Sequence, residues 1–204
     1  MAHFIDVTLG MKNGMISFPG DPVFEMKPVL SLANSDPVNT SLLTLCSHSG
    51  THVDPPAHYI KGARTVDQIP LDYLIGDGII IDMCGKTRIT ADDIRRSNLT
   101  DHIRVFFKTD NSLRMRNGSF QEDYCCLDID GAEFLVHMGV KLVGIDYLSI
   151  EGYESPDGTV HKTILASGAA IVEGLDLSNA PAGPCRIYCL PMRIENADGA
   201  PARV

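Results

Sequence analysis

Apolar residues recur along the chain in short runs and in alternation with polar residues, and both patterns are typical of β-strands. Residues 4–9 alternate with period two and predict a first strand with one buried face. Residues 38–46 are rich in β-branched side chains, which favour strands. The same reasoning predicts further strands at residues 23–30, 78–83, 104–108, 141–145, 169–173 and 185–192.

Helical patterns are fewer than strand patterns. The sequence predicts helices at residues 89–96, 128–138 and 163–167, and a short helix or a turn at 66–74. Thr90, with Asp93 three residues later, is a typical start for the first of these helices. A chain of 204 residues, 44% of them hydrophobic, is long enough to bury one sizeable core. We therefore expect a single domain over residues 1–204, with a mixed α/β fold in which helices flank a β-rich core.

The net charge of −9 narrows the range of partners. Nucleic acids and anionic membrane surfaces select basic patches, so the composition disfavours both and favours a small-molecule partner. No basic N-terminal region and no run of about eighteen apolar residues occurs, which predicts a soluble, cytoplasmic protein. Six cysteines without a C-x-x-C pair are typical of reduced, buried thiols, and the spacing of Cys185 and Cys189 leaves a thiolate metal site open.

The candidate chemistry is concentrated in residues 46–59. His48, His52, Asp54 and His58 fall within eleven residues there. Three imidazoles and one carboxylate are donors that suit a divalent zinc or manganese ion with water in an open position. The alternative is a polar loop with incidental histidines. We favour the metal site because so many donors lie so close together.

The backbone around these donors is predicted to be extended. Two histidines four residues apart can share one helical face, as in the H-E-x-x-H metalloproteases, but Gly50 and the pair Pro55 and Pro56 disfavour a helix here. In a strand, His52 and Asp54 point to the same side and can share one ion. His58, beyond the prolines, is either a further ligand or a proton carrier beside the metal.

His161 and Glu173 form a second metal-capable pair. On one continuous helix they would lie about 18 Å apart, too far for a single site. Gly168 between them permits a helix over residues 163–167 followed by a strand that runs back past it, which would bring both side chains together. The alternative is a residue at a helix start and a solvent-exposed strand end, without a joint role.

Three other features bear on the site, and two of them have more than one interpretation. Phe18 lies in a Pro- and Gly-rich turn at residues 17–22, where an aromatic ring either lines a pocket for a planar substrate or plugs the end of a strand. Residues 113–124 are polar and predict a mobile loop that covers the site. Asp146 ends a predicted strand, where it either supports a metal ligand or caps the next turn.

The pattern H-x-G-T-H-x-D-x-P-x-H of residues 48–58 resembles the signature of the cyclase-family metal hydrolases, which include bacterial kynurenine formamidases (arylformamidases) and isatin hydrolases. Residues 17–22 resemble the family's aromatic-Pro-Gly-Asp loop, and residues 143–146 with Ser149 resemble its V-G-I-D-x-x-S segment. His161 and Glu173 match its C-terminal ligand positions. The resemblance spans nearly the whole chain.

This resemblance implies a swivelling β/β/α fold and a homo-oligomer, either a dimer or a tetramer. It implies that His48, His52 and Asp54 bind a first divalent ion, zinc or manganese. In the formamidases, Asp54 and Glu173 would bridge to a second ion, which His161 completes. One or two ions per subunit are therefore expected.

The resemblance also implies roles beyond the metal. His58 would act as proton donor and acceptor. Phe18, in the substrate-binding loop, stands where formamidases commonly have tryptophan, and the chain contains no tryptophan. The resemblance therefore specifies the metal chemistry more firmly than the substrate.

We accordingly expect hydrolysis of a small aryl formamide or cyclic amide by a metal-activated water, with His58 as general acid and base. The reaction of kynurenine formamidase in tryptophan catabolism is the nearest example. One alternative is a metal-dependent cyclase or dehydratase, or an isatin-type lactam hydrolase, acting on another small carbonyl compound. Another is a non-catalytic metal-binding protein, in which the ion has no open position.

Overall fold

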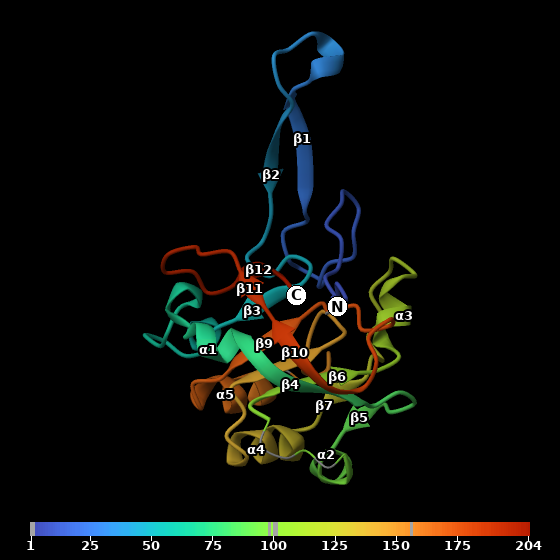
Figure 1. The fold of residues 1–204 in the computed structure, drawn as a ribbon, viewed down its shortest axis with the longest axis vertical. Helices are drawn as coiled ribbons and strands as arrows, with labels where there is room; N and C mark the ends of the chain where they lie inside the picture. Colours follow the sequence, from blue (N-terminus) through green and yellow to red (C-terminus); the bar gives the residue numbers. More distant parts are fainter. Residues whose placement is uncertain (1–2, 98, 100–101, 156) are drawn as a thin grey trace.

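A curled sheet of eight strands forms the centre of the molecule in the computed structural model, which describes residues 3–97, 99, 102–155 and 157–204 (Figure 1). Its strand order is β10-β4-β6-β8-β9-β3-β12-β11. The bounds are β3 (His52–Asp54), β4 (Ile75–Asp82), β6 (Arg104–Lys108), β8 (Leu142–Ile145), β9 (Ala170–Glu173), β10 (Gly183–Tyr188), β11 (Leu190–Pro191) and β12 (Ala200–Arg203).

The middle of this sheet is parallel and its two sides are antiparallel. Strands β4, β6, β8 and β9 are parallel neighbours, while β10 pairs antiparallel with β4 and β3 pairs antiparallel with β9. Parallel strands need crossover connections, and helical segments supply them here. The helices are α1 (Leu71–Leu74), α2 (Ala91–Arg96), α3 (Asn111–Met115), α4 (Ile129–His137) and α5 (Thr159–Ala166).

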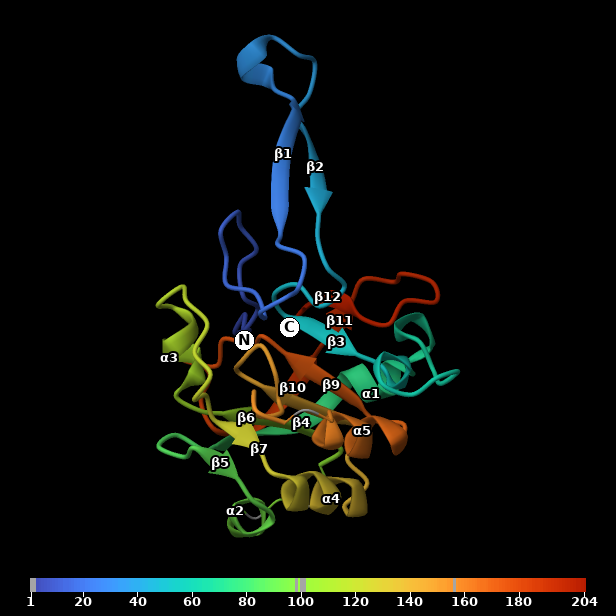
Figure 2. The same ribbon diagram turned by 180° about the vertical axis from the view of Figure 1, so that it is seen from behind.

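Two hydrophobic clusters cover the two faces of the sheet. Successive strand residues point to opposite faces, so Ile79 and Ile81 of β4 enter one cluster and Ile80 enters the other. The cluster with Ile79 and Ile81 also takes in residues of α2, α4 and α5. These three helices lie on the side of the sheet away from the long hairpin (Figures 1 and 2).

That hairpin is the most extended feature of the fold. Strands β1 (Glu25–Leu30) and β2 (Thr40–Thr44) pair antiparallel, with the 3₁₀ turn η1 (Leu32–Asn34) near the tip, and they project from the rest of the chain as an arm (Figure 2). Two further 3₁₀ turns are η2 (Pro56–His58) and η3 (Val66–Gln68). A small separate sheet pairs β5 (Arg88–Ile89) with β7 (Cys126–Leu127).

Most predicted elements are confirmed, including the start of α2. Thr90 Oγ1 accepts from the Asp93 backbone N–H, and the Asp93 carboxylate accepts in return from the Thr90 N–H. The strand predicted at residues 185–192 is divided between β10 and β11, which pair with different neighbours, β4 and β12. No helix in the described part of the chain is long and apolar enough to cross a membrane.

The prediction of a strand at residues 4–9 is wrong. This segment makes only an isolated bridge, between Thr8 and Leu175. The Val7 N–H donates to the Val204 carbonyl, and the Leu9 N–H donates to Thr51 Oγ1. The segment is therefore fixed by single hydrogen bonds to several partners instead of by pairing along a strand. Val7 is nevertheless buried, as the alternation predicts.

Two other predictions need correction. The helix predicted at residues 163–167 begins earlier, because α5 starts at Thr159 and contains His161 in its first turn. Part of the predicted loop at residues 113–124 is helical, since α3 extends to Met115. In both cases tertiary contacts described below decide the conformation.

We predict that Gly174, which follows β9, is required for stability. Its φ is +69°, and a Cβ atom there would lie 2.2 Å from the Gly50 carbonyl oxygen. The left-handed backbone costs an alanine roughly 1–2 kcal/mol and overpacking roughly 1–3 kcal/mol more. Urea unfolding of Gly174→Ala should show a loss of about 3 kcal/mol.

Gly139→Ala is the matched control. Gly139 has a similar φ of +76°, but a Cβ there would meet nothing within 4 Å. Only the left-handed cost of roughly 1–2 kcal/mol is expected. Equal losses in the two variants would mean that the Gly50 turn moves away at little cost.

Candidate metal centre

The pairing of β3 with β9 builds the centre of the candidate site. His52 lies directly opposite Glu173 in this antiparallel register, and directly opposite residues share a face. Asp54, two residues along β3, points to the same side. His52 Nε2 lies 3.4 Å from Asp54 Oδ1 and 3.5 Å from Glu173 Oε2. All three side chains are buried.

His48 reaches this group from the turn that precedes β3. Gly50 bends the turn with a φ of +65°, and His48 Nδ1 lies 2.8 Å from Asp54 Oδ1. The other ring nitrogen, Nε2, is 3.2 Å from the exposed carboxylate of Asp198 in the loop before β12. A Cβ atom on Gly199 would lie 2.6 Å from the His48 ring, so the glycine leaves room for the imidazole.

His161 reaches the group from the opposite side. It lies in the first turn of α5, and its Nε2 is 3.0 Å from Glu173 Oε1. Its Nδ1 is 2.8 Å from Glu151 Oε2. The structure therefore brings His161 and Glu173 together across Gly168, as the sequence allows, although α5 begins earlier than predicted.

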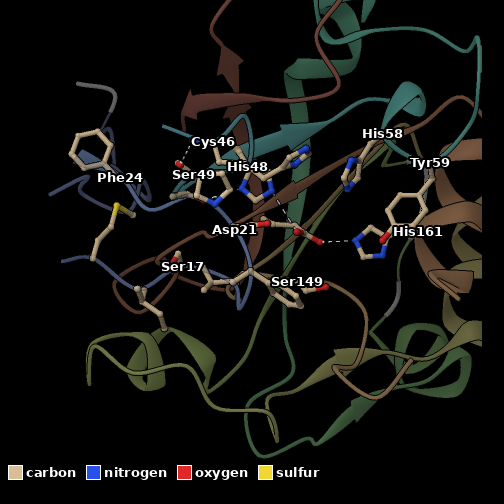
Figure 3. A pocket seen from close by; sticks show the side chains of 18 residues that line it. Ser17, Asp21, Phe24, Cys46, His48, Ser49, His58, Tyr59, Ser149 and His161 are labelled. Atoms are coloured by element: carbon tan, nitrogen blue, oxygen red, sulfur yellow. Dashed lines mark hydrogen bonds and ion pairs between the residues drawn. The ribbon is translucent and has the colours of Figure 1, made fainter. Parts of the chain in front are cut away.

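His58 stands at the edge of this group. Pro55 and Pro56 lead into the 3₁₀ turn η2, which ends at His58 and holds its ring half-buried. The His58 ring centroid lies 4.1 Å from that of His48 and 6.3 Å from that of His161. His58 thus lies within reach of the other donors and also faces the pocket (Figure 3).

The donor atoms fit a divalent cation. Ligand atoms of His48, Asp54 and His58 lie within 4.8 Å of one another, and so do those of His52, Asp54 and Glu173. Asp54 belongs to both sets, and its Oδ2 is buried without a hydrogen-bond partner in the described structure. A buried, unpaired carboxylate oxygen is costly, and a cation bound there would remove that cost. Mixed imidazole and carboxylate donors suit zinc or manganese.

Carboxylates control the protonation of two histidines. Burial lowers the pKa of His48, but the hydrogen bond and charge of Asp54, with those of Asp198, outweigh it and raise the pKa to about 9. Burial likewise opposes protonation of His161, and hydrogen bonds to Glu151 and Glu173 raise its pKa to about 10. The pKa of Asp54 is lowered: burial raises it, but the charge of His52 and the hydrogen bond from His48 prevail.

His58 behaves differently from these histidines. Burial lowers its pKa, and the charge of Asp54 does not fully compensate. The His58 imidazole is therefore neutral near neutral pH in the metal-free protein. A neutral, half-buried imidazole beside a pocket can accept and return a proton.

A pocket of about 220 Å³ opens beside the donors. Phe18 is among its lining residues. Asp21, Tyr59 and Ser149 also line it (Figure 3). The Phe18 ring packs edge-on against Phe120, with centroids 5.3 Å apart. Phe18 thus lines the pocket and at the same time anchors the aromatic residues behind it. Phe120 comes from the segment predicted to cover the site.

Sequence reasoning missed several residues around the site. Glu151 and Asp198 hold the outer nitrogens of His161 and His48, yet each is far in sequence from the histidine motif. The Tyr59 ring stacks on His161 with centroids 4.9 Å apart, and its place directly after His58 was the only available signal.

Two sequence alternatives are also decided by contacts. Asp146 accepts hydrogen bonds from the backbone N–H and hydroxyl groups of both Thr109 and Ser112, so it fixes the turn after β6. These contacts match neither expected role, since they involve no metal-capable residue and a turn that precedes Asp146 in the chain. Cys185 and Cys189 are free thiols, and neither belongs to the donor sets found in the described structure.

Comparison with known proteins gives consistent matches. The family model described as "Putative cyclase" matches residues 5–152. A kynurenine formamidase of Erythrobacter litoralis is 30% identical over 199 residues, which cover 97% of this chain and 90% of the relative.

Solved structures match over nearly the whole chain. A potential metal-dependent hydrolase with cyclase activity has a TM-score of 0.84 at 32% identity, covering 98% of this chain and 94% of that one. Isatin hydrolase A from Labrenzia aggregata has a TM-score of 0.82 at 20% identity, covering 98% and 91%. The second likeness is one of fold alone.

We predict that binding of zinc to the metal-free protein releases protons. At pH 8, His48 with a pKa of about 9 and His161 with a pKa of about 10 are mostly protonated, and each must be neutral to coordinate. Apparent zinc affinity should therefore rise with pH up to these values. Calorimetric titration in buffers of different ionisation enthalpy measures the number of protons released.

Asp198→Asn supplies the control for this measurement. It removes one carboxylate that raises the pKa of His48 while leaving the buried donors in place. Fewer protons should be released than in the unmodified protein at the same pH. Zinc binding with no dependence on buffer would contradict the assignment of these histidines as ligands.

Proposed function

Because the chain belongs to the putative cyclase family, we propose that it is a metal-dependent hydrolase that cleaves a small aryl formamide or cyclic amide, as an arylformamidase does. The observation that carries this proposal is the buried convergence of His52, Asp54 and Glu173 with His48 and His161, beside a pocket with the aromatic wall of Phe18. The relative from Erythrobacter litoralis supports N-formylkynurenine as the substrate and tryptophan catabolism as the setting.

We assign the metal ligands as follows. His48, His52 and Asp54 would hold one divalent ion, and Asp54, Glu173 and His161 would hold a second. Donor atoms that lie within 4.8 Å of one another group the residues differently, as His48, Asp54 and His58 and as His52, Asp54 and Glu173. Asp54 belongs to both of these sets, which supports two ions. The donor types suit zinc and manganese alike. A divalent cation in such a site would polarise a carbonyl group and lower the pKa of bound water to about 7.

The chain's own residues then supply positioning and proton transfer. His58, whose lowered pKa keeps it neutral, accepts the proton of the attacking water and delivers it to the leaving nitrogen. Phe18 offers its ring to the aryl group of the substrate. Tyr59, stacked on His161, excludes water from that side of the site. The products are a carboxylic acid and an amine.

A second candidate is a cyclase or dehydratase reaction, or isatin-type lactam hydrolysis. The 32% identity to a potential metal-dependent hydrolase with cyclase activity supports this second candidate. So does Phe18, which stands where formamidases commonly have tryptophan. Product analysis separates the candidates, because hydrolysis adds water to the substrate and dehydration removes it. A purely structural metal site is disfavoured, because the donors open onto a pocket.

We further propose that the protein is a homo-oligomer, a dimer or a tetramer, and that the β1–β2 arm forms its interface. An isolated two-stranded hairpin is marginally stable in water, so other atoms must cover its faces. Large apolar side chains lie exposed along the arm, among them Met26, Val29, Leu42 and Leu43. A second copy of the chain is the partner that the family resemblance supports.

All six cysteines lie in the described part of the chain and are free. Free thiols support the cytoplasmic location expected from the sequence.

The role of His58 is tested by His58→Ala. Turnover of N-formylkynurenine and isatin should fall by about 10²–10⁴-fold, the usual contribution of general acid–base catalysis, with metal content unchanged. Asp54→Ala, by contrast, should lose both metal and activity, as measured by elemental analysis of protein purified without added metal. Loss of metal in His58→Ala would make His58 a ligand together with His48 and Asp54.

The pH profile gives an independent test of the same residue. A general base must be neutral, and burial lowers the pKa of His58 from its usual value of about 6.5. The value of kcat/KM should therefore fall on the acidic side with a midpoint below pH 6.5. An acidic limb centred well above pH 7 would contradict this assignment.

The arm is tested by charge substitution. Leu42→Lys and Leu43→Lys place charges on residues that are 58% and 52% exposed in the single chain, so only an interface should be disturbed. Light scattering after size-exclusion chromatography should show smaller species for the pair of substitutions. Thr40→Lys, a polar exposed position on the same strand, is the control. An unchanged mass for the double variant would show that the arm does not hold the oligomer.

A further inference from the structure

Glu151 is a buried carboxylate that the proposed chemistry does not use. It follows β8 in the segment Ser149–Glu151 and is only 4% exposed. A buried charge is retained at a cost unless its oxygens are well paired. Glu151 meets that requirement, because both of its oxygens accept hydrogen bonds, and the identity of the donors indicates what it does.

The first set of donors belongs to the start of α5. The residue before this helix, Gly158, has no side chain with which to cap it. Glu151 Oε1 accepts from the Val160 N–H at 3.2 Å, and Oε2 accepts from the His161 N–H at 3.3 Å. A carboxylate at a helix N-terminus satisfies free N–H groups and complements the helix dipole. Glu151 therefore explains why α5 begins before the predicted residue 163.

The second donor is the His161 ring itself. His161 Nδ1 lies 2.8 Å from Glu151 Oε2. A carboxylate can only accept, so the hydrogen of this pair belongs to Nδ1. Nε2 is then the ring nitrogen that faces Glu173, at 3.0 Å from Oε1. The same carboxylate oxygen thus fixes the position of the helix and the orientation of the ring.

The neighbouring residue holds the other partner. The Ile150 N–H donates to Glu173 Oε1 at 2.7 Å. Two consecutive residues after β8 therefore hold His161 and Glu173 in their relative positions. Ser155 Oγ donates to Glu151 Oε1 and keeps the carboxylate in place from the far side.

We propose that Glu151 is a positioning residue, which holds His161 in the Nδ1–H tautomer with Nε2 directed toward Glu173, where it would be free to bind a cation. This inference rests on the proposed function, in which His161 is a ligand. Acceptors behind metal-binding histidines typically contribute 10–100-fold to metal affinity. The prediction therefore concerns metal binding by this chain, whatever substrate it hydrolyses.

Glu151→Gln is the decisive variant. Glutamine has the same size but carries no charge and only one accepting oxygen, so it cannot accept from the Val160 N–H, the His161 N–H and the His161 ring together. Zinc affinity, measured by competition with a chromophoric chelator, should fall about 10–100-fold. In the zinc-loaded protein labelled with ¹⁵N-histidine, the slowly exchanging Nδ1–H signal of His161 should be lost or should exchange rapidly.

Ser155→Ala is the matched control, because it removes a hydrogen bond from Oε1 and leaves Oε2 on His161. Its zinc affinity should stay within about twofold of the unmodified protein, with the His161 signal retained. Glu151→Asp keeps the charge with a shorter reach, should bind zinc with intermediate affinity, and replaces Glu151→Gln if that variant does not fold.

The outcomes separate this inference from the proposed function. If the unmodified protein binds no zinc or manganese, the proposed function is wrong and the role of Glu151 falls with it. If it binds zinc, and Glu151→Gln binds equally well with the His161 signal unchanged, only the positioning role is overturned. An equal loss of affinity in Glu151→Gln and Ser155→Ala would also overturn it, since the effect would then follow from disturbance of the loop.

Discussion

The pairing of β3 with β9 is the constraint on which the candidate site depends. It sets His52 opposite Glu173, two residues separated by more than a hundred positions in the chain. Strand β9 is also the point where the sheet changes direction, since it runs parallel to β8 and antiparallel to β3. The Gly174 turn that follows packs directly against Gly50, so the fold that aligns the strands also aligns His48. A shift of one residue in this register would point the donors to the other face of the sheet.

This arrangement places carboxylates in the interior, where burial of a charge is unfavourable. Hydrogen bonds between these carboxylates and the histidines reduce that unfavourable free energy. His48 lies between Asp54 and Asp198, and His161 lies between Glu173 and Glu151. His52 Nδ1 donates to the Gly50 carbonyl at 2.9 Å, which leaves Nε2 toward the carboxylates. In each ring, one nitrogen faces the carboxylate of Asp54 or Glu173, and the other pairs with an acceptor outside this group. An acceptor on the outer nitrogen fixes which nitrogen is free to coordinate.

Local rules predicted the parts of this site that depend on nearby residues. The two-residue spacing of His52 and Asp54 gave their common face, and Gly168 gave the reversal that joins His161 to Glu173. The rules failed where the cause lies far away in the chain. The first turn of α5 depends on Glu151, and residues 4–9 are bound by Val204 and Thr51, so neither conformation follows from local periodicity. Phe18 was correctly expected in a turn, but its contact with Phe120 depends on the folded positions of two distant loops.

The division between strands and loops has a consequence for specificity. The metal-capable donors at the centre lie on short, buried strands, where packing leaves little freedom of position. Part of the pocket wall comes from the turn at residues 17–22, and Phe120 and Tyr153, which also lie in irregular segments, pack against Phe18 of that wall. Loops tolerate substitution better than buried strands, so the choice of substrate can change while the metal chemistry is kept. Phe18, which stands where the family resemblance implies a tryptophan in the formamidases, is at a position of this kind, because it lines the pocket and is not one of the proposed ligands.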